Sequence, residues 1–490
     1  MSSMEHVDVL IVGAGLSGIG AACQISMACP GKSFAILEGR EAIGGTWDLF
    51  RYPGVRSDSD MYTLGYRFRP WRDAKAIADG PAILNYIRDT ANEFGVDKKI
   101  LFDHRVKRAS WSSENAAWTV EAETKSGPTK FTCNFLYLCT GYYDYENGYT
   151  PEWQGLENFR GQIIHPQKWS DDLDYSGKRI VVIGSGATAV TLVPAMAETA
   201  EHVTMLQRSP TYIMTLPSED RVANFLRRRL PDRTAYAVTR WKNVLLQMFF
   251  YVLSRKRPET MKRWIAKGVR TELGDEYDIS HFTPAYNPWD QRLCLVPDSD
   301  LFQAIRDGRA SIVTDEIETF TETGLLLKSG ERIDADIIVT ATGLNLKLMS
   351  GLQLVVDGEP VDISRTMAYK GMMYSDVPNL ASAFGYTNAS WTLKCDLTAE
   401  YVCRILNYMD RRGFSQCTPR LTDPSVKPER VLDFTSGYVE RALHTLPSQG
   451  SKTPWRLHQN YIKDLSMLRY GRVDDGTMEF KAVSRGDRSV

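Results

Sequence analysis

The sequence contains no pair of cysteines at the CxxC spacing, although it has eight cysteines. This absence argues against a redox-active dithiol, a disulfide reductase and a zinc ribbon. No His, Cys or acidic residue stands at a metal-ligand spacing from His165, so no metal is predicted. No apolar run reaches the length of a membrane span, and the first predicted strand begins near residue 7, which leaves no room for a signal peptide. A net charge of −1 argues against nucleic acid as the main partner. Together these absences favour a reduced, cytoplasmic protein.

Two glycine-rich loops, 171 residues apart, are the most informative local pattern that the sequence does contain. Each loop follows an apolar run typical of a buried parallel strand, at residues 7–12 and 179–183, and precedes small residues typical of a helix start. In such a loop the first glycine makes the turn, the second lets the backbone approach a pyrophosphate, and the third lets the helix pack on the strand. The three positions are Gly13, Gly15 and Gly18 in the first loop and Gly184, Gly186 and Ala189 in the second. The pattern predicts an α/β fold with two Rossmann-like dinucleotide-binding domains.

The residues that end the next strand of each unit predict the two ligands. Glu38 ends the strand at 34–37, 20 residues after Gly18, where a carboxylate accepts hydrogen bonds from both hydroxyls of an adenosine ribose. A 2′-phosphate would be repelled there. Arg208 and Ser209 follow the strand at 203–206, and a guanidinium can hold a phosphate with two hydrogen bonds. We therefore predict FAD at the first loop and NADPH at the second.

Two similar strand-turn patterns, at residues 135–141 and 336–343, indicate where the chain leaves the first domain and returns to it. They predict an FAD-binding domain made of residues 1–143 together with 336–490, the latter including the C-terminal region. The NADPH-binding domain, residues 144–335, would then be inserted in the FAD-binding domain. Within it, residues 212–286 are rich in Arg, Trp and Met at helical spacing and predict a helical insertion.

Residues 241–257 place a mostly apolar stretch between basic ends. Two interpretations stay open for this segment. It is either a helix packed on its own domain, which is the more common use of an apolar stripe, or a helix that associates weakly with a membrane surface.

A further motif with the spacing FxGxxxHxxxW lies between the two glycine loops. Its residues are Phe159, Gly161, His165 and Trp169. The motif resembles the fingerprint of the type I Baeyer-Villiger monooxygenases, although Ser170 departs from the family at the next position. A second motif similar to the family covers residues 44–58 and includes Gly45, Trp47 and Asp58. The resemblance covers nearly the whole chain and is greatest for the branch that contains the ethionamide-activating monooxygenase.

This resemblance implies an enzyme that uses FAD, NADPH and O2 to convert ketones to esters or lactones through a C4a-peroxyflavin. Arg292 matches the family's catalytic arginine, whose permanent charge would stabilise the peroxyanion and the adduct that it forms with the carbonyl. Asp58 matches the aspartate that pairs with this arginine and holds it in place. From the local sequence alone, Asp58 would be interpreted as part of an ordinary Asx turn, and Arg292 would be interpreted as a residue of a surface ion pair.

The resemblance also assigns a role to the linker and raises a question about the cofactor. The motif that contains His165 lies, in the family, on the linker between the two nucleotide domains and couples their motion. Many members carry a lysine before the catalytic arginine that helps to hold the NADPH phosphate, whereas this chain has Gln291, which leaves Arg208 as the main phosphate ligand. Aromatic residues that could line the substrate pocket are Trp391, Trp455 and Tyr461.

Sulfide or thioamide S-oxygenation is an expected second activity, because the protonated form of the same oxidant is electrophilic. Two alternatives stay open at the level of the sequence. One is an amine or sulfide oxygenase with little ketone activity, and the other is a redox sensor that binds both nucleotides without turnover. A product assay with a ketone and a sulfide distinguishes these two alternatives from the ketone-oxidising enzyme.

Overall fold

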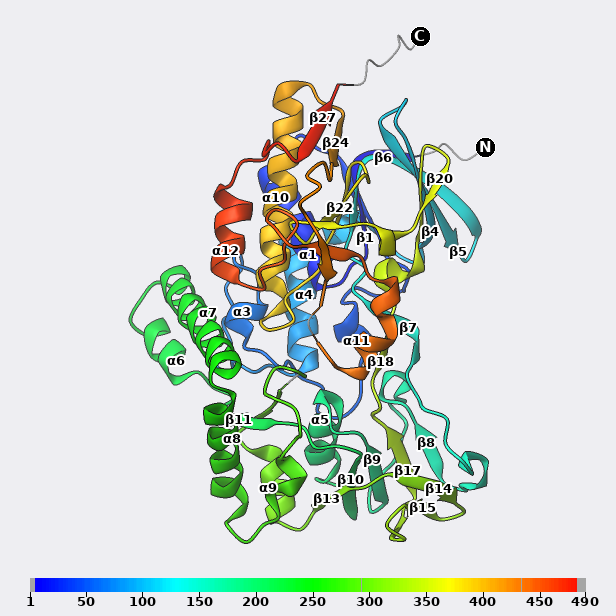
Figure 1. Cartoon of the computed structure of the whole chain (residues 1–490), viewed down its shortest axis with the longest axis vertical. Coiled ribbons are helices and arrows are strands. Elements are labelled where there is room, and N and C mark those ends of the chain that lie inside the picture. The colour runs from blue at the N-terminus through cyan, green and yellow to red at the C-terminus, as the bar shows by residue number, and fades with distance from the viewer. Residues whose placement is uncertain (1–4, 292, 433, 483–490) are drawn as a thin grey trace.

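The structure is a computed structural model and describes residues 5–291, 293–432 and 434–482. Two β-sheets lie toward opposite ends of the long axis of the molecule, and helices α6 (Arg221–Arg227) and α7 (Asp232–Lys256) project from one side between them (Figure 1). The predicted α/β class with two Rossmann-like units is confirmed. Each sheet carries one of the glycine loops at the end of a central strand.

The larger sheet contains nine of the described strands and carries the first glycine loop. Strand β1 (Glu5–Val12) pairs in parallel with β2 (Phe34–Leu37) on one side and with β6 (Gly127–Leu138) on the other. Its apolar run is buried on both faces, because α1 (Leu16–Ala28) and α10 (Trp391–Arg412) cover one face and the antiparallel strands pack beneath the other. The remaining strands are β3 (Ile100–Leu101), β4 (Arg105–Ser112), β5 (Ala117–Thr124), β19 (Gln353–Val356), β20 (Glu359–Val361) and β23 (Leu380–Ser382).

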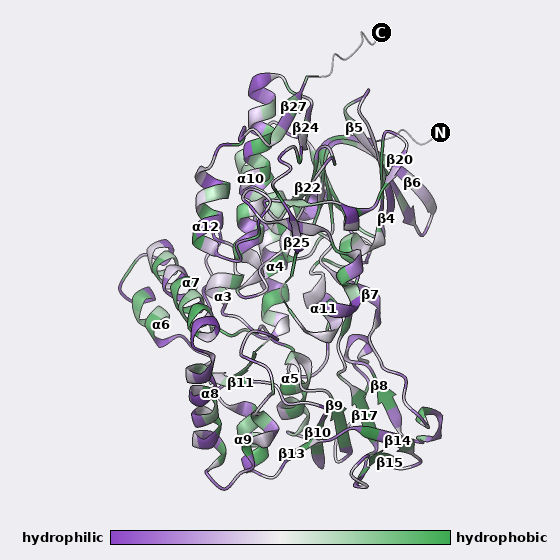
Figure 2. Ribbon diagram, in the orientation of Figure 1, coloured by the Kyte–Doolittle hydropathy of each residue, from purple (hydrophilic) through white to green (hydrophobic). Residues whose placement is uncertain are grey.

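The smaller sheet is parallel throughout and carries the second glycine loop. In spatial order its strands are β13 (Ala310–Thr314), β10 (His202–Gln207), β9 (Arg179–Ile183), β17 (Ile337–Thr340) and β8 (Gln162–Ile164). These strands are strongly hydrophobic (Figure 2), and α5 (Ala187–Met196) and α9 (Asp300–Arg306) pack on them. The order corrects the boundary predicted before residue 336. Strand β17 belongs to the smaller sheet, because it lies between β9 and β8, so the chain returns to the larger sheet only after Thr340.

The two crossings between the sheets pair with each other. Strand β7 (Tyr143–Gly148) leads away from β6, and β18 (Leu344–Leu346) follows β17, and the two run antiparallel. Beside this pair, the Thr342 hydroxyl donates to the Tyr149 carbonyl oxygen at 2.6 Å. The crossings therefore form one short ribbon that connects the two units.

The predicted helical insertion is present at residues 212–286. It begins with β11 (Ile213–Leu216), continues through α6, α7 and α8 (Pro258–Leu273), and is followed by β12 (Cys294–Pro297), which pairs with β11. A buried ion pair ties the insertion to the larger unit, since Arg240 on α7 lies 3.2 Å from Asp396 on α10. Burial raises the pKa of Asp396 to about 6, although the charge of Arg240 acts in the opposite direction. No helix among the described residues is long and apolar enough to cross a lipid bilayer.

Candidate active site

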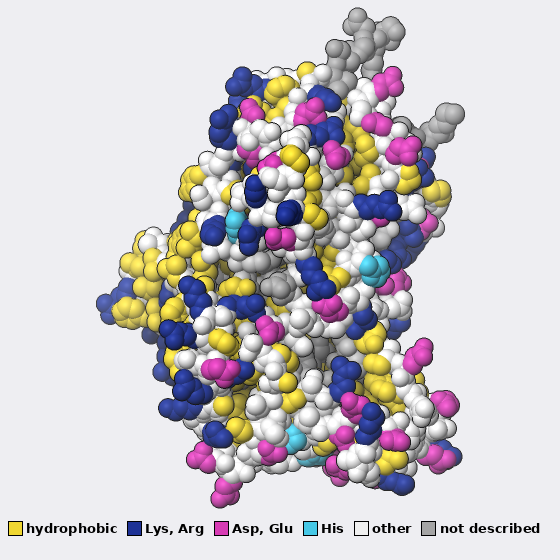
Figure 3. Space-filling model, viewed as in Figure 1, with side chains coloured by type: hydrophobic (Ala, Val, Ile, Leu, Met, Phe, Trp, Pro, Cys, Tyr) yellow, Lys and Arg dark blue, Asp and Glu magenta, His cyan; other side chains and the backbone are white. Residues whose placement is uncertain are grey.

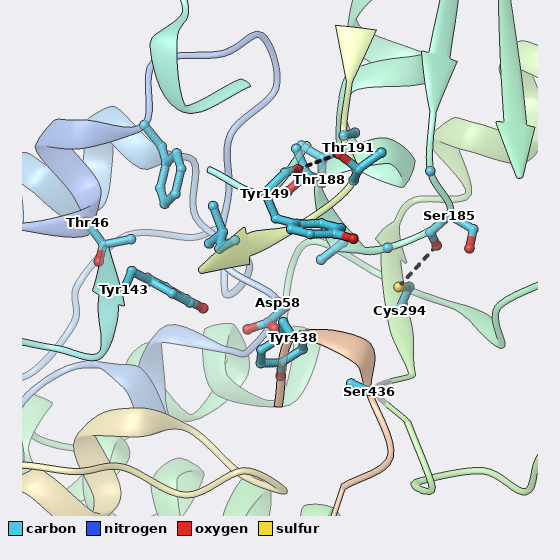
Figure 4. A pocket seen from close by; sticks show the side chains of 18 of the residues that line it. Thr46, Asp58, Tyr143, Tyr149, Ser185, Thr188, Thr191, Cys294, Ser436 and Tyr438 are labelled. Atoms are coloured by element: carbon cyan, nitrogen blue, oxygen red, sulfur yellow. Dashed lines mark hydrogen bonds between the residues drawn. The ribbon is translucent and has the colours of Figure 1, made fainter. Parts of the chain in front are cut away.

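Both glycine loops open into one cavity of about 900 Å³ between the two units. This volume lies within the usual range for cofactor and substrate sites, roughly 300–1,000 Å³. Figure 4 shows the cavity with Thr46 and Tyr143 on one side and Ser185 and Cys294 on the other. Asp58 points into the space between them. The two predicted nucleotide sites therefore face each other across a shared space.

The first loop has the geometry of a pyrophosphate cradle. Gly13 has φ +104°, and a Cβ atom there would lie 2.5 Å from the Cys139 carbonyl oxygen. A Cβ atom on Gly18 would lie only 1.8 Å from the Gly13 carbonyl oxygen, so no larger residue fits between the strand and the helix. Gly15 lines the cavity and precedes the first turn of α1, where backbone N–H groups and the helix dipole favour an anion. These three positions fit the nucleotide that the sequence predicts.

The loop at residues 44–50 closes over the first glycine loop. Gly45 has φ +57°, and a Cβ atom there would lie 3.0 Å from the Cα atom of Gly15, so the two loops meet glycine against glycine. The loop is held by Asp48, which is buried and accepts a hydrogen bond from Arg40 at 2.7 Å. Gly45 and Trp47 both line the cavity. The second motif of the sequence is therefore part of the same site.

Glu38 lies at the end of β2, next to the first loop but behind the cavity wall. Its carboxylate accepts hydrogen bonds from the backbone N–H groups of Ala14, at 2.7 Å, and Arg40, at 2.9 Å. Burial raises the pKa of Glu38, and these two hydrogen bonds oppose the rise. Each carboxylate oxygen can accept a second hydrogen bond, so the bonds to the loop leave capacity for a ribose.

The second glycine loop, in the smaller unit, has the same geometry as the first. Gly184 has φ +136°, and a Cβ atom there would lie 2.3 Å from the Ala341 carbonyl oxygen. Gly186 lines the cavity with open space around it, and Ala189 is fully buried at the start of α5. The Ser185 hydroxyl donates to the Ser209 carbonyl oxygen at 3.0 Å, which fixes the loop against the end of β10.

Arg208 and Ser209 follow β10 and line the cavity with exposed side chains. Asp315 and Glu316 line the same end of the cavity. Lys328 lowers the pKa of Glu316 most, and the charge of Arg208 lowers it further. Arg208 is thus available to an anion in a place where acidic side chains would otherwise repel it.

Asp58 lies on a loop that is anchored on both sides. Before it, Arg56 forms an ion pair with Asp300 at the start of α9, in the other unit. After it, Asp60 caps α3 (Met61–Leu64) by accepting from the Thr63 N–H at 3.0 Å, and accepts from Asn243 on α7 at 2.8 Å. The loop that carries Asp58 therefore connects both nucleotide units with the helical insertion.

The residues of the FxGxxxHxxxW motif do not line the cavity. A Cβ atom on Gly161 would lie 2.4 Å from the Asp336 carbonyl oxygen, and Phe159 and Trp169 pack against the core of the smaller unit. His165 accepts from the Gln167 N–H at Nδ1, so its Nε2 carries the proton and donates to the Gly343 carbonyl oxygen at 3.2 Å. Burial lowers the pKa of His165. The motif thus lies at the crossing between the units.

The sequence interpretation missed the C-terminal wall of the cavity. Ser436, Tyr438 and Arg441 line it, on or beside α11 (Gly437–Ala442). The Arg441 guanidinium lies 3.5 Å from the centre of the Tyr149 ring, and burial lowers its pKa. No local motif marks these residues, because their partners are far away in the sequence.

Aromatic side chains form another part of the wall. Trp391 donates to the Ser17 hydroxyl at 2.8 Å and stacks on Tyr142, with ring centres 5.0 Å apart, and both rings line the cavity. Trp455 and Tyr461, which were predicted beside it, are buried in the core of the larger unit instead. A signal was present for Tyr142, because it directly follows the strand-turn pattern at residues 135–141.

The predicted catalytic residue Arg292 lies outside the described residues. Its neighbour Gln291 lines the cavity.

A fold with two Rossmann-like units facing one cavity defines a protein that binds two dinucleotides, as in flavin-dependent oxidoreductases. The family described as Flavin-binding monooxygenase-like matches residues 73–350, and an NAD(P)-binding Rossmann-like domain matches residues 11–75. The chain belongs to this flavin-binding monooxygenase family and is an FAD-containing monooxygenase.

Similar proteins support this assignment over the full length of the chain. The FAD-containing monooxygenase EthA of Mycobacterium tuberculosis is 56% identical, covering 97% of this chain and 98% of its own. The probable FAD-binding monooxygenase AlmA of Acinetobacter baylyi is 49% identical, covering 97% and 96%. Among solved structures, an oxidized steroid monooxygenase bound to NADP has a TM-score of 0.76 at 23% identity, covering 97% of this chain and all of its own. The predicted similarity to the ethionamide-activating branch and the predicted FAD are confirmed, and the NAD(P)-binding match agrees with a dinucleotide-binding fold.

Proposed function

We propose that the protein converts ketones to esters or lactones with NADPH and O2. The observation that supports this proposal is the shared cavity, because a nucleotide at each glycine loop places a hydride donor and a flavin in the same space. When bound, the reduced flavin reacts with O2 and supplies the oxidant that delivers one oxygen atom to the substrate. The chain's own residues bind the two nucleotides, orient the ketone and exclude water.

In this proposal FAD occupies the first loop and NADPH the second. The clash of a Cβ atom at Gly13, Gly18 or Gly184 and the open space at Gly186 fit a pyrophosphate at each loop. Glu38 holds the adenosine ribose of FAD, and Arg208 with Ser209 holds the 2′-phosphate of NADPH.

Arg292 is the proposed catalytic residue, because a guanidinium keeps its charge at every working pH and stabilises negative oxygen during the reaction. Asp58 is the proposed positioning residue for it, and its place in the cavity, on a loop anchored to both units, supports that role. The Phe159–Gly161–His165–Trp169 motif would couple the units, which agrees with the bond from His165 to the crossing at Gly343.

The aromatic wall favours an apolar substrate. Phe50, Tyr142, Tyr143 and Trp391 line the cavity next to the first loop, and apolar surface is more abundant than polar surface in cofactor and substrate sites of this kind. A ketone with a hydrocarbon chain or an aryl group suits this wall, and sulfides of the same shape would also fit.

The test is a product assay with the FAD-loaded protein, NADPH and, in turn, 2-dodecanone, phenylacetone and thioanisole. We expect an ester from at least one ketone and a sulfoxide from thioanisole. Sulfoxide without any ester would replace the proposal by a heteroatom oxygenase. NADPH oxidation that yields only hydrogen peroxide with all three compounds would contradict the proposed substrate class.

A further inference from the structure

Helix α7 turns its polar side toward the protein. Arg240 donates to the Tyr62 carbonyl oxygen at 2.7 Å, and Asn243 and Gln247 donate to the Asp60 carboxylate at 2.8 and 2.9 Å. Most of the helix residues that are buried, including Thr239 and Ser254, are polar as well. A helix on the surface of a globular protein normally shows the opposite arrangement, with its apolar stripe facing the core.

The apolar side of α7 consequently faces outward. Val238, Trp241, Leu245, Phe249 and Val252 follow one another at spacings of three and four residues, which places them on one face of the helix. Each is more than 40% exposed, and Phe249 is 58% exposed. This stripe is too regular to be a scatter of single surface residues.

Helix α6 extends this apolar surface, with Val222 50% and Phe225 57% exposed. We call the surface made by Val222, Phe225 and the α7 stripe the α6–α7 face. Figure 3 shows it as hydrophobic side chains gathered on the projecting side of the molecule, with basic side chains at its edge. Most of the large apolar side chains that the described residues expose lie between residues 216 and 264. An apolar surface of this kind marks an interaction site.

The charge around the α6–α7 face is strongly positive. Residues 221–257 contain ten Lys and Arg and one Asp, a net charge of +9, whereas the whole chain has a net charge of −1, so the rest of the chain carries −10. Three of these ten, Arg240, Lys242 and Arg255, pair with carboxylates outside this range, and the other basic residues account for the positive charge of the face. The basic residues cluster at the two ends of the face, at Arg227–Arg229 and at Arg255–Arg257. Phosphate groups of lipids are the complement of such a rim, and Trp241 adds an aromatic side chain of the kind enriched at membrane interfaces.

We propose that the α6–α7 face binds to the surface of an anionic lipid bilayer. The apolar stripe would enter the boundary between headgroups and acyl chains, while the basic rim contacts the phosphates. A second copy of the chain is a poorer occupant, because symmetric contact would bring two segments of charge +9 against each other. The proposal does not depend on the substrate or the chemistry of the enzyme.

The test is flotation of the FAD-loaded protein with vesicles of phosphatidylglycerol and phosphatidylcholine in equal parts, compared with vesicles of phosphatidylcholine alone. We expect the protein to float with the first vesicles, to float less with the second, and to be released by high salt. In the variant with Leu245→Ser and Phe249→Ser, binding should fall about tenfold or more. The matched control, Met27→Ser with Leu421→Ser, removes two exposed apolar residues away from the face and should bind as the wild type.

A second set of variants tests the basic rim. Replacing Arg228, Arg229 and Lys256 by Gln should weaken binding about tenfold or more, whereas the same change at three exposed basic residues elsewhere should not. These control residues are Lys98, Arg332 and Arg365. The flavin content and thermal midpoint of every variant establish that it is folded.

Three results would overturn the proposal. They are a wild-type protein that does not float, equal flotation of the Leu245→Ser, Phe249→Ser variant, and equal binding to both kinds of vesicle. A wild-type oligomer that dissociates in this variant, without any flotation, would assign the face to a second copy of the chain instead.

Discussion

Replacing Arg208 by Gln is expected to weaken the use of NADPH and to leave the use of NADH almost unchanged. Arg208 is exposed at the end of the cavity where Asp315 and Glu316 also lie. A hydrogen bond between a charged donor and a phosphate contributes about 1.5–3 kcal/mol. Since every 1.4 kcal/mol corresponds to a factor of about ten, the KM for NADPH should rise about 10- to 150-fold.

The increase in the KM for NADPH is expected to lie in the upper part of this range. In the variant, the 2′-phosphate still meets the Asp315 and Glu316 carboxylates, and only neutral donors remain at the end of β10, namely the introduced amide, the Ser209 hydroxyl and the backbone. NADH has no 2′-phosphate, so its KM should change by less than about twofold. The measurement is steady-state oxidation of each nucleotide at a fixed ketone concentration, with Arg365→Gln as a control on an exposed arginine outside the cavity. Equal increases in the two KM values, or no increase in either, would refute the phosphate assignment.

Three further predictions concern the oxygenation step, the first loop and the crossing. Arg292→Ala should retain FAD and NADPH-dependent flavin reduction but lose about a hundredfold or more of the ester-forming rate, and wild-type ester yield would contradict its role. Gly18→Ala places a methyl group 1.8 Å from the Gly13 carbonyl oxygen, so it should lose FAD and about 1–3 kcal/mol of stability, whereas Gly31→Ala, with open space around it, should do neither. The pKa of His165 in the folded protein lies below its usual 6.5, so the unfolded chain binds more protons and the stability that His165 contributes is lost as the pH falls below 6.5. Thermal midpoints of the wild type and His165→Gln should therefore converge or cross between about pH 7.5 and about pH 5, and a constant difference would contradict this.

The glycine loops could be predicted from the sequence because their geometry is local. Gly13 and Gly18 are five residues apart, and the requirement for both follows from one strand, one turn and one helix. The same holds for the residues that end the next strand, Glu38 and Arg208. Local patterns of this kind were sufficient for the fold class, the family and the cofactors.

Long-range pairing could not be predicted in the same way. Strands β6 and β17 have similar apolar sequences that end in a threonine-glycine turn, yet β6 lies in the larger sheet and β17 in the smaller one. At the cavity, Arg441 contacts the Tyr149 ring, which lies 292 residues earlier in the chain. Nothing in the sequence near either residue indicates such a contact.

Helix α7 shows a third kind of limit. Its apolar stripe is visible in the sequence, and an inward orientation is the common outcome for such a stripe. The orientation is reversed because the polar side finds partners in Asp60 and Asp396, which are far away in the chain. Periodicity predicts that a helix has two faces, whereas tertiary contacts decide which of them is buried.

The most direct test of the proposed function follows one oxygen atom from O2 into the product. The FAD-loaded protein would be supplied with NADPH, 2-dodecanone and isotopically labelled O2, and the product would be analysed by mass spectrometry while NADPH consumption is recorded. We predict an ester that carries one labelled oxygen atom, formed in equal amount to the NADPH consumed. An unlabelled product, or NADPH consumption matched by hydrogen peroxide without ester, would contradict the proposal.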